Sequence, residues 1–291
     1  MRFLFFLCCI SLYWHSNSQI QNTDTAKINP KRFLITNSAI GSISVSSIIG
    51  LQQLWYSNDE DASFHFFDDS KNWLQMDKYG HAMSSYELTR LMNKAYRWSG
   101  LSKNKSMILS ASISFGYLST IEIMDGYSPN WGFSWSDMGA NLMGASLFLF
   151  QEKYFLKQIF QPKFSFHPTE YSEIRPEVLG QNIAESILKD YNGQSYWISF
   201  SPGHLGISAW PKWLMLSLGH SIDGRLKGNS SQYMGYSSNR EFLFSLDIDL
   251  TEFKVKSKFL ASMFTIINSI KLPFPTLIYT EEKLNFSPIY F

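Results

Sequence analysis

Residues 73–100, WLQMDKYGHAMSSYELTRLMNKAYRWSG, predict the helix around which the N-terminal half of this chain is built, with Gly100 as its C-cap. Asp77 and His81 stand four positions apart and therefore share one face of that helix. The same face continues through small and apolar residues, namely Ser84, Leu88, Leu91 and Ala95. Because the face is otherwise apolar, we expect the carboxylate and the imidazole to point into the protein.

Three more helices are expected before residue 161. The stretch 33–55 is uncharged and long enough to span a bilayer, but its many serines equally fit a buried helix packed through small residues. The next helix covers 106–124, and the last begins at Ser136 or Asp137 and continues to about residue 160. The connections are short, which indicates an antiparallel bundle of about four helices.

The sequence after residue 161 mixes helix and strand patterns. Helices are expected at 176–191 and 257–271, strands at 196–200, 213–220 and 241–250, and a short strand pair at the end of the chain. In the strand 241–250, Asp247 and Asp249 share the polar face, and we expect that face to be solvated rather than to bind calcium. The predicted fold class is α+β, with a helical bundle over 19–160 and a mixed α/β region with a small antiparallel sheet over 161–291.

Composition excludes several classes of protein. The 291 residues include 25 basic and 24 acidic side chains, and this net charge of +1 gives no electrostatic case for a nucleic-acid partner. Hydrophobic residues make up 45% and charged residues 17%, which is too apolar for a disordered chain. An aromatic content of 16% is typical of an envelope protein. No phosphate-binding loop occurs, so no nucleotide partner is expected.

The N-terminus resembles an export signal over residues 1–18. Arg2 is followed by an almost wholly apolar run, and Ser16 and Ser18 supply small residues at the positions before a cleavage site at Gln19. Cys8 and Cys9 offer lipid attachment as an alternative, but Leu7 is not the small residue that such a site needs. We therefore expect an exported protein that stays in the cell envelope, faces the periplasm and is associated with a membrane.

A cluster of polar residues is expected at one end of the predicted bundle. Glu122 lies on an apolar face near the end of its helix, and Asp137 and Asn141 repeat the four-residue spacing at the start of the next helix. In an antiparallel bundle these ends meet the end that carries Asp77 and His81. Carboxylates there also profit from the positive ends of helix dipoles.

Three kinds of chemistry fit this cluster. It can be a buried polar network that includes Lys78 and fixes the helix register. It can hold a divalent metal ion as a cofactor, with Asp77, His81, Glu122 and Asp137 as ligands. It can also be a catalytic site in which His81 is a general base oriented by a carboxylate.

The same residues carry a resemblance to a known family. The segments Asp77-Lys78-x-x-His81, Glu122-x-x-Asp125-Gly126 and Asp137-x-x-x-Asn141-x-x-Gly144 resemble the YfiM-like group of predicted periplasmic lipoproteins, in the longer form found in Bacteroidetes. The order of these motifs is also distantly similar to VanZ-like membrane proteins. The resemblance implies a periplasmic envelope location and no particular reaction.

We expect an envelope protein with a structural or interaction role. The alternative is a membrane-proximal enzyme or metal-binding protein that acts on a lipid or a cell-wall component through the His/carboxylate cluster. The expected partners are membrane lipids or envelope proteins in either case.

Overall fold

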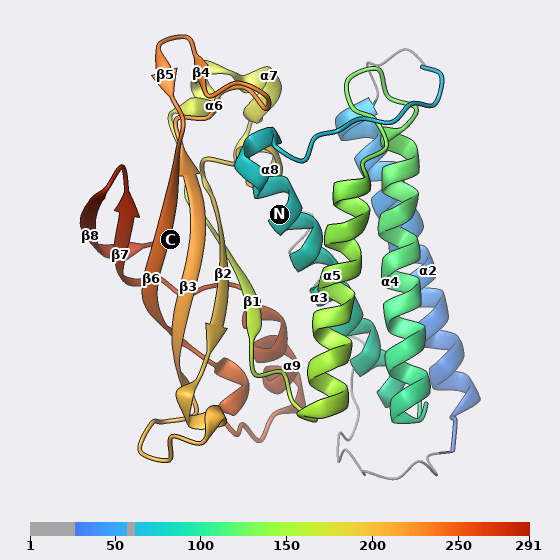
Figure 1. Cartoon of the computed structure of the whole chain (residues 1–291). Coiled ribbons are helices and arrows are strands. Elements are labelled where there is room, and N and C mark those ends of the chain that lie inside the picture. The colour runs from blue at the N-terminus through green and yellow to red at the C-terminus, as the bar shows by residue number, and fades with distance from the viewer. Residues whose placement is uncertain (1–26, 57–61) are drawn as a thin grey trace. The chain divides into compact units, whose positions relative to one another are not determined.

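The computed structural model describes residues 27–56 and 62–291, so the predicted export signal lies outside the described residues. Within them the chain forms eight α-helices, α2 to α9, and an antiparallel sheet of six strands (Figure 1). The predicted α+β class is confirmed. The chain separates into two compact units. The helical unit contains the described residues up to 70 together with 81–157, and the sheet unit contains 71–80 and 158–291.

The helical unit is made from four long helices. They are α2 (Pro30–Leu51, extended by a π-turn, Gln52–Tyr56), the part of α3 (Met76–Trp98) that begins at His81, α4 (Lys103–Asp125) and α5 (Trp135–Tyr154). Each overlaps a predicted helix, whereas their arrangement as one bundle stays a prediction. Two segments, Pro30–Leu54 and Lys103–Asp125, are long and apolar enough to cross a membrane by length and composition.

Small polar residues line the contact between α3 and α4. Ser106, Ser110 and Ser114 repeat at four-residue intervals on α4, and all three are fully buried. The hydroxyl of Ser106 donates to the side chain of Asn93 at 2.6 Å, and that of Ser114 donates to the carbonyl of Ser85 at 3.1 Å. Side chains of this size allow two helices to approach closely, and the hydroxyls of Ser106 and Ser114 remain hydrogen-bonded.

The sheet unit is built on the strand order β1-β2-β3-β6-β7-β8, in which all neighbours are antiparallel. The strands are β1 (Gln161–Phe166), β2 (Gln194–Phe200), β3 (Leu214–Asp223), β6 (Asn239–Ile248), β7 (Phe274–Thr280) and β8 (Lys283–Tyr290). A small hairpin joins β4 (Gln232–Tyr233) to β5 (Tyr236–Ser237). The remaining helices are α6 (Tyr171–Ile174), α7 (Pro176–Leu179), α8 (Ile183–Lys189) and α9 (Lys258–Ile267).

Two predicted helices of this region are shorter in the structure. The helix expected over 176–191 is divided into α7 and α8 at Gly180, whose φ of +107° interrupts a right-handed helix. The helix expected over 257–271 ends at Ile267, because residues 269–271 pair with β1. The amide of Phe164 donates to the carbonyl of Ser269 at 2.9 Å, and the amide of Lys271 donates to the carbonyl of Phe164 at 2.8 Å. β1 itself was not predicted.

The sidedness of β6 corrects the sequence analysis. Asp247 and Asp249 were expected on a solvated face, but both are 0% exposed. On the opposite face of the same strand, Phe242 is 55% exposed and Phe244 is 44% exposed. Alternation along a strand separates two faces but does not indicate which face is buried, and here the polar face is inside.

Candidate functional site

His81 is positioned by the first turns of α3. An unusual turn precedes this helix, since Trp73, Leu74 and Gln75 all have positive φ values, at 48°, 50° and 64°. Arg240 of the sheet unit holds the turn by donating to the carbonyl of Leu74 at 2.9 Å. The helix therefore begins at Met76, three residues later than the sequence pattern indicated.

Two further helix ends supply the carboxylates. Glu122 lies in the last turn of α4, and its side chain is 1% exposed. Asp137 lies in the first turn of α5, where the hydroxyl of Ser134 accepts a hydrogen bond from the amide of Asp137 at 3.1 Å. The N-cap of α5 is thus Ser134, not Ser136 or Asp137 as the sequence indicated. Asn141, one turn further along α5, is fully buried.

The imidazole of His81 connects these side chains. Its Nδ1 lies 3.2 Å from Oδ1 of Asn141 and 3.5 Å from Oε1 of Glu122, while its Nε2 lies 3.9 Å from Oδ1 of Asp137. The side chain of His81 is 18% exposed, so the ring lies between a buried interior and the surface. Four of the predicted site residues, from three helices, therefore meet around one ring.

The environment of the ring nitrogens favours one tautomer of His81. Both atoms nearest Nδ1 are oxygens that accept hydrogen bonds, so Nδ1 is assigned as the donor. In the neutral imidazole the lone pair is then on Nε2, which faces the carboxylate of Asp137. The distance of 3.9 Å is too long for a hydrogen bond. A lone pair opposite a carboxylate is unfavourable unless a proton or a cation lies between them.

A close contact between α3 and α5 fixes this geometry. A Cβ atom added to Gly144 would lie 1.9 Å from the carbonyl oxygen of Ala82, so only glycine permits the observed distance between the helices. One turn further along α3, the hydroxyl of Ser85 donates to the carbonyl of Asn141 at 2.6 Å. The backbone that carries Asn141 is thereby tied to the helix that carries His81.

Asp77 and Lys78 make their observed contacts inside the sheet unit. The carboxylate of Asp77 accepts a hydrogen bond from the hydroxyl of Tyr191 at 2.9 Å, and its second oxygen lies 2.9 Å from Nζ of Lys78. Asp77 precedes His81 by one turn of the same helix. Tyr191 is the last residue of the helix predicted over 176–191, and its bond to Asp77 could not be read from either sequence segment.

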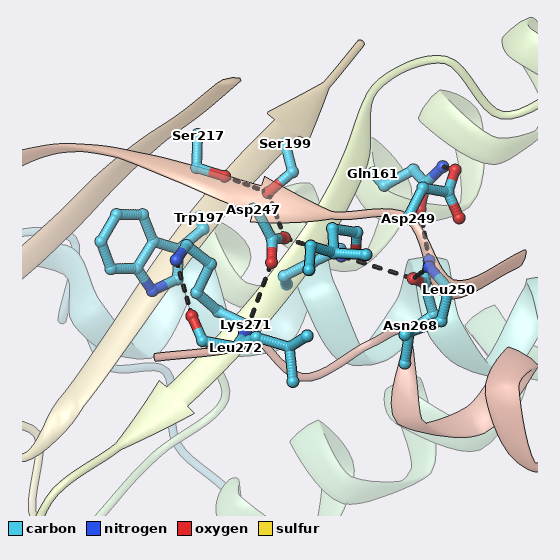
Figure 2. A network of polar contacts seen from close by, with 12 residues as sticks. Gln161, Trp197, Ser199, Ser217, Asp247, Asp249, Leu250, Asn268, Lys271 and Leu272 are labelled. Atoms are coloured by element: carbon cyan, nitrogen blue, oxygen red, sulfur yellow. Dashed lines mark hydrogen bonds and ion pairs between the residues drawn. The ribbon is translucent and has the colours of Figure 1, made fainter. Parts of the chain in front are cut away.

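The sequence analysis missed a second group of buried charges, in the sheet unit. Nζ of Lys163 lies 2.7 Å from the carboxylate of Asp247, and neither side chain is exposed. Asp247 also accepts from Ser199 at 3.1 Å, and Asp249 accepts from Gln161 at 2.7 Å (Figure 2). Lys163 and Asp247 come from β1 and β6, which are not neighbours in the sheet, so the strand patterns by themselves do not bring the two together.

Lys271 completes this buried group. Its ammonium group lies 5.0 Å from the ring centre of Trp197 (Figure 2). It also lies 3.3 Å from the hydroxyl of Ser245. Burial lowers the pKa of Lys271 to about 8, an effect that the charge of Lys163 strengthens and that of Asp247 opposes. Lys163, Lys271, Asp247 and Asp249 balance in formal charge, which is typical of a structural network.

Comparisons with known proteins point to the helical unit. No curated protein and no solved structure matches the chain. Residues 36–153, which include all six predicted site residues, match the family model described as "Predicted periplasmic lipoprotein (DUF2279)". The match does not test the YfiM-like name or the likeness to VanZ-like proteins, which stay predictions. It supports an exported protein of the cell envelope, similar over its helical part to a family of periplasmic lipoproteins whose function is uncharacterised.

Proposed function

We propose that this chain is a periplasm-facing envelope protein whose helical unit binds a divalent transition-metal ion at His81. The observation that carries the proposal is the arrangement of the two ring nitrogens. Nδ1 faces the oxygens of Asn141 and Glu122, which leaves Nε2 directed at the carboxylate of Asp137.

The distances support a metal ion on the Nε2 side of the ring. Two ligand atoms that are each about 2.1 Å from one ion lie roughly 3–4 Å apart, and Nε2 of His81 and Oδ1 of Asp137 are separated by 3.9 Å. Metal-binding histidines commonly donate their other ring N–H to a carboxylate or carbonyl oxygen. Glu122 and Asn141 are suited to that role at Nδ1. Asp77, one turn before His81, is the further ligand that the sequence analysis suggests.

The charge of the cluster also favours a cation. Glu122 and Asp137 are two buried acidic side chains beside one imidazole. Burying carboxylates is costly, and a divalent ion would reduce that cost. The mixed nitrogen and oxygen ligands fit zinc, manganese or ferrous iron better than calcium.

Metal binding can be measured directly by isothermal titration calorimetry with zinc and manganese on chelator-treated protein. We expect His81→Ala to abolish binding and Glu122→Gln to weaken it about 10–100-fold, because Glu122 would only orient the ring. His204→Ala is the matched control, since His204 pairs with Glu252 in the sheet unit at 3.1 Å. Equal affinities of His81→Ala and His204→Ala would rule out the proposed site.

The structural role expected from the sequence predicts a different result. A register-fixing network needs no metal, so the untreated and chelator-treated proteins would unfold at the same denaturant concentration. His81→Ala would then destabilise both to the same extent. A metal site instead predicts that zinc raises the unfolding free energy of the wild type and leaves that of His81→Ala unchanged.

We further propose that α2 attaches the protein to a membrane. Its apolar stretch has only 6% of its residues buried, and no charge occurs between Arg32 and Asp59. The matched family is described as lipoproteins, which suggests a lipid at the N-terminus. Mass spectrometry of the mature N-terminus distinguishes a protein cleaved before Gln19 from a lipid-modified one. A chain that begins at Gln19 agrees with the predicted cleavage site, and a lipid-modified Cys8 or Cys9 agrees with the family description.

A further inference from the structure

The sheet unit has an apolar row that crosses five strands and remains exposed. The paired residues run from Ile198 on β2 to Phe286 on β8, and the complete row is Ile198, Leu218, Phe244, Leu277 and Phe286. Each of these side chains is between 37% and 64% exposed. We call this row, with Phe242 and Leu246 beside Phe244 on β6, the outer face.

The row of residues beside the outer row shows that the two faces of the sheet differ consistently across the strands. The adjacent row of paired residues, one position along each strand, consists entirely of serine and threonine. Its members are Ser199, Ser217, Ser245, Thr276 and Ser287. The first four are buried, and they lie on the side that holds Asp247, Lys163 and Lys271. Polar side chains therefore occupy the interior, and large apolar side chains point outward.

A folded protein in water rarely leaves so continuous an apolar surface uncovered. The outer face contains no charged residue along its central row, which crosses five of the six strands, from β2 to β8. Leaving aliphatic and aromatic side chains exposed forfeits roughly 25 cal/mol for each Å² that could be buried. An apolar environment outside this unit is needed to recover that free energy.

Charges at the end of the strands indicate what kind of environment this is. Lys212 precedes β3, and Lys254 and Lys256 follow β6, and all three are exposed. Aromatic side chains lie among them, with the rings of Trp213 and Phe253 6.2 Å apart. Lysine mixed with exposed aromatic residues is typical of segments that lie at an anionic membrane surface.

The opposite ends of the strands carry both charge signs. Glu281 and Glu282 stand beside Lys283 in the β7–β8 hairpin, and β3 ends at Asp223, all exposed. The three lysines Lys212, Lys254 and Lys256, which we define as the basic rim, therefore lie together at one edge of the outer face, whereas the other edge is mixed. An apolar face with a basic rim at one edge matches a bilayer in which acyl chains lie beside anionic headgroups.

We propose that the outer face binds an anionic phospholipid surface, with the apolar row against acyl chains and the basic rim against headgroup phosphates. This contact is independent of the metal site, because no residue of the outer face or the basic rim belongs to that site. It also differs from attachment through α2, which would hold the chain at a membrane without orienting the sheet.

The test must report on the outer face itself, since α2 alone could bring the protein to vesicles. The sequence has cysteines only at positions 8 and 9, so replacing both by serine allows a single label elsewhere. We would place an environment-sensitive fluorophore on Leu218→Cys in the full chain and add phosphatidylcholine vesicles with or without phosphatidylglycerol. The matched label is Met234→Cys, at an exposed tip of the β4–β5 hairpin.

With phosphatidylglycerol present, we expect the emission of the label at position 218 to shift to shorter wavelength and to be quenched by doxyl-labelled lipid. The emission of the label at position 234 should neither shift nor be quenched. Lys256→Glu should weaken the response about fivefold, and reversing all three rim lysines should weaken it on the order of 100-fold. Lys283→Glu, at the other end of the strands, is the matched charge reversal and should have little effect. Should Leu218→Cys misfold, Phe286→Cys at the edge strand reports on the same row.

Two outcomes would overturn the proposal. A label at 218 that stays in water with both kinds of vesicle would mean that lipid does not cover the outer face. A shift that appears without vesicles and grows with protein concentration would mean that a second copy of the chain covers it. Neither result bears on metal binding at His81, which calorimetry measures separately.

Discussion

The helical unit and the sheet unit each bury a group of ionisable side chains, but the buried carboxylates have different partners in the two groups. In the sheet unit Lys163 lies 2.7 Å from Asp247, so the carboxylate has an ammonium partner at contact distance. In the helical unit Glu122 and Asp137 lie 3.5 Å and 3.9 Å from the nitrogens of His81. An ammonium–carboxylate pair at contact distance is typical of a structural group, whereas carboxylates spaced more widely around an imidazole leave room for a proton or a metal ion.

This difference suggests how to separate structural from functional polar groups in an uncharacterised protein. Burial alone does not distinguish them, since Glu122 and Asp247 are equally inaccessible to solvent. The kind of partner and the length of the contacts distinguish a structural group from a functional one. The following predictions test that criterion.

The largest effect is expected from Lys163→Met. Asp247 would remain buried without its ion partner, and breaking such a pair costs about 3–5 kcal/mol of unfolding free energy. Urea denaturation measures the loss. Lys256→Met, on the surface, should change stability by less than about 0.5 kcal/mol. The double variant Lys163→Met/Asp247→Leu should recover much of the loss, and failure to recover would mean that the pair is not the reason for the destabilisation.

A smaller loss is expected from Gly144→Ala in the helical unit. The new methyl group would collide with the carbonyl of Ala82, and forcing α3 and α5 apart should cost about 1–3 kcal/mol. Gly139→Ala is the matched control on α5, because nothing lies within 4 Å of its added Cβ. It should stabilise the helix by roughly 0.5–1 kcal/mol. Metal affinity should fall only in Gly144→Ala, and equal affinities would show that the helix contact does not shape the site.

Asp249→Ala sharpens the comparison in the sheet unit. Asp249 accepts hydrogen bonds from Gln161 at 2.7 Å and from the amide and hydroxyl of Thr251 at 2.9 Å and 2.6 Å. Stranding these donors should cost about 1–3 kcal/mol in thermal or chemical unfolding. The surface variant Glu173→Ala provides the baseline. A change as small as that of Glu173→Ala would restore the solvated face expected from the sequence.

The smallest effect is a dependence of stability on pH. The pKa of Lys271 is lowered from 10.5 to about 8 by burial, so above pH 8 the unfolded chain binds this proton more strongly than the folded one. The unfolding free energy should therefore rise as pH increases from 8 toward about 9.5, below the range in which tyrosines ionise in the unfolded chain. Lys271→Met should flatten the rise while Lys256→Met retains it. A rise of equal slope in Lys271→Met would assign the effect to another group.

Local sequence information was sufficient for the elements that carry the candidate site. The spacing of Asp77 and His81, and of Asp137 and Asn141, placed each pair on one helix face, and those helices are present as α3 and α5. It failed at the start of α3, where three consecutive residues adopt positive φ because Arg240, far along the chain, holds the turn. It also failed at residues 269–271, which pair with β1 instead of continuing α9.

Periodicity can be read directly from the residues: it shows which of them share a helix face, which alternate along a strand, and where charge is absent. Which face is buried, and which atoms meet, depends on how the elements pack. Alternation along β6 is the same whichever side faces inward, so the burial of Asp247 depended on Lys163, a residue 84 positions earlier on a strand that is not its neighbour in the sheet. The same holds for His81, whose ring nitrogens acquire different partners only because α4 and α5 bring Glu122, Asn141 and Asp137 to opposite sides of one imidazole.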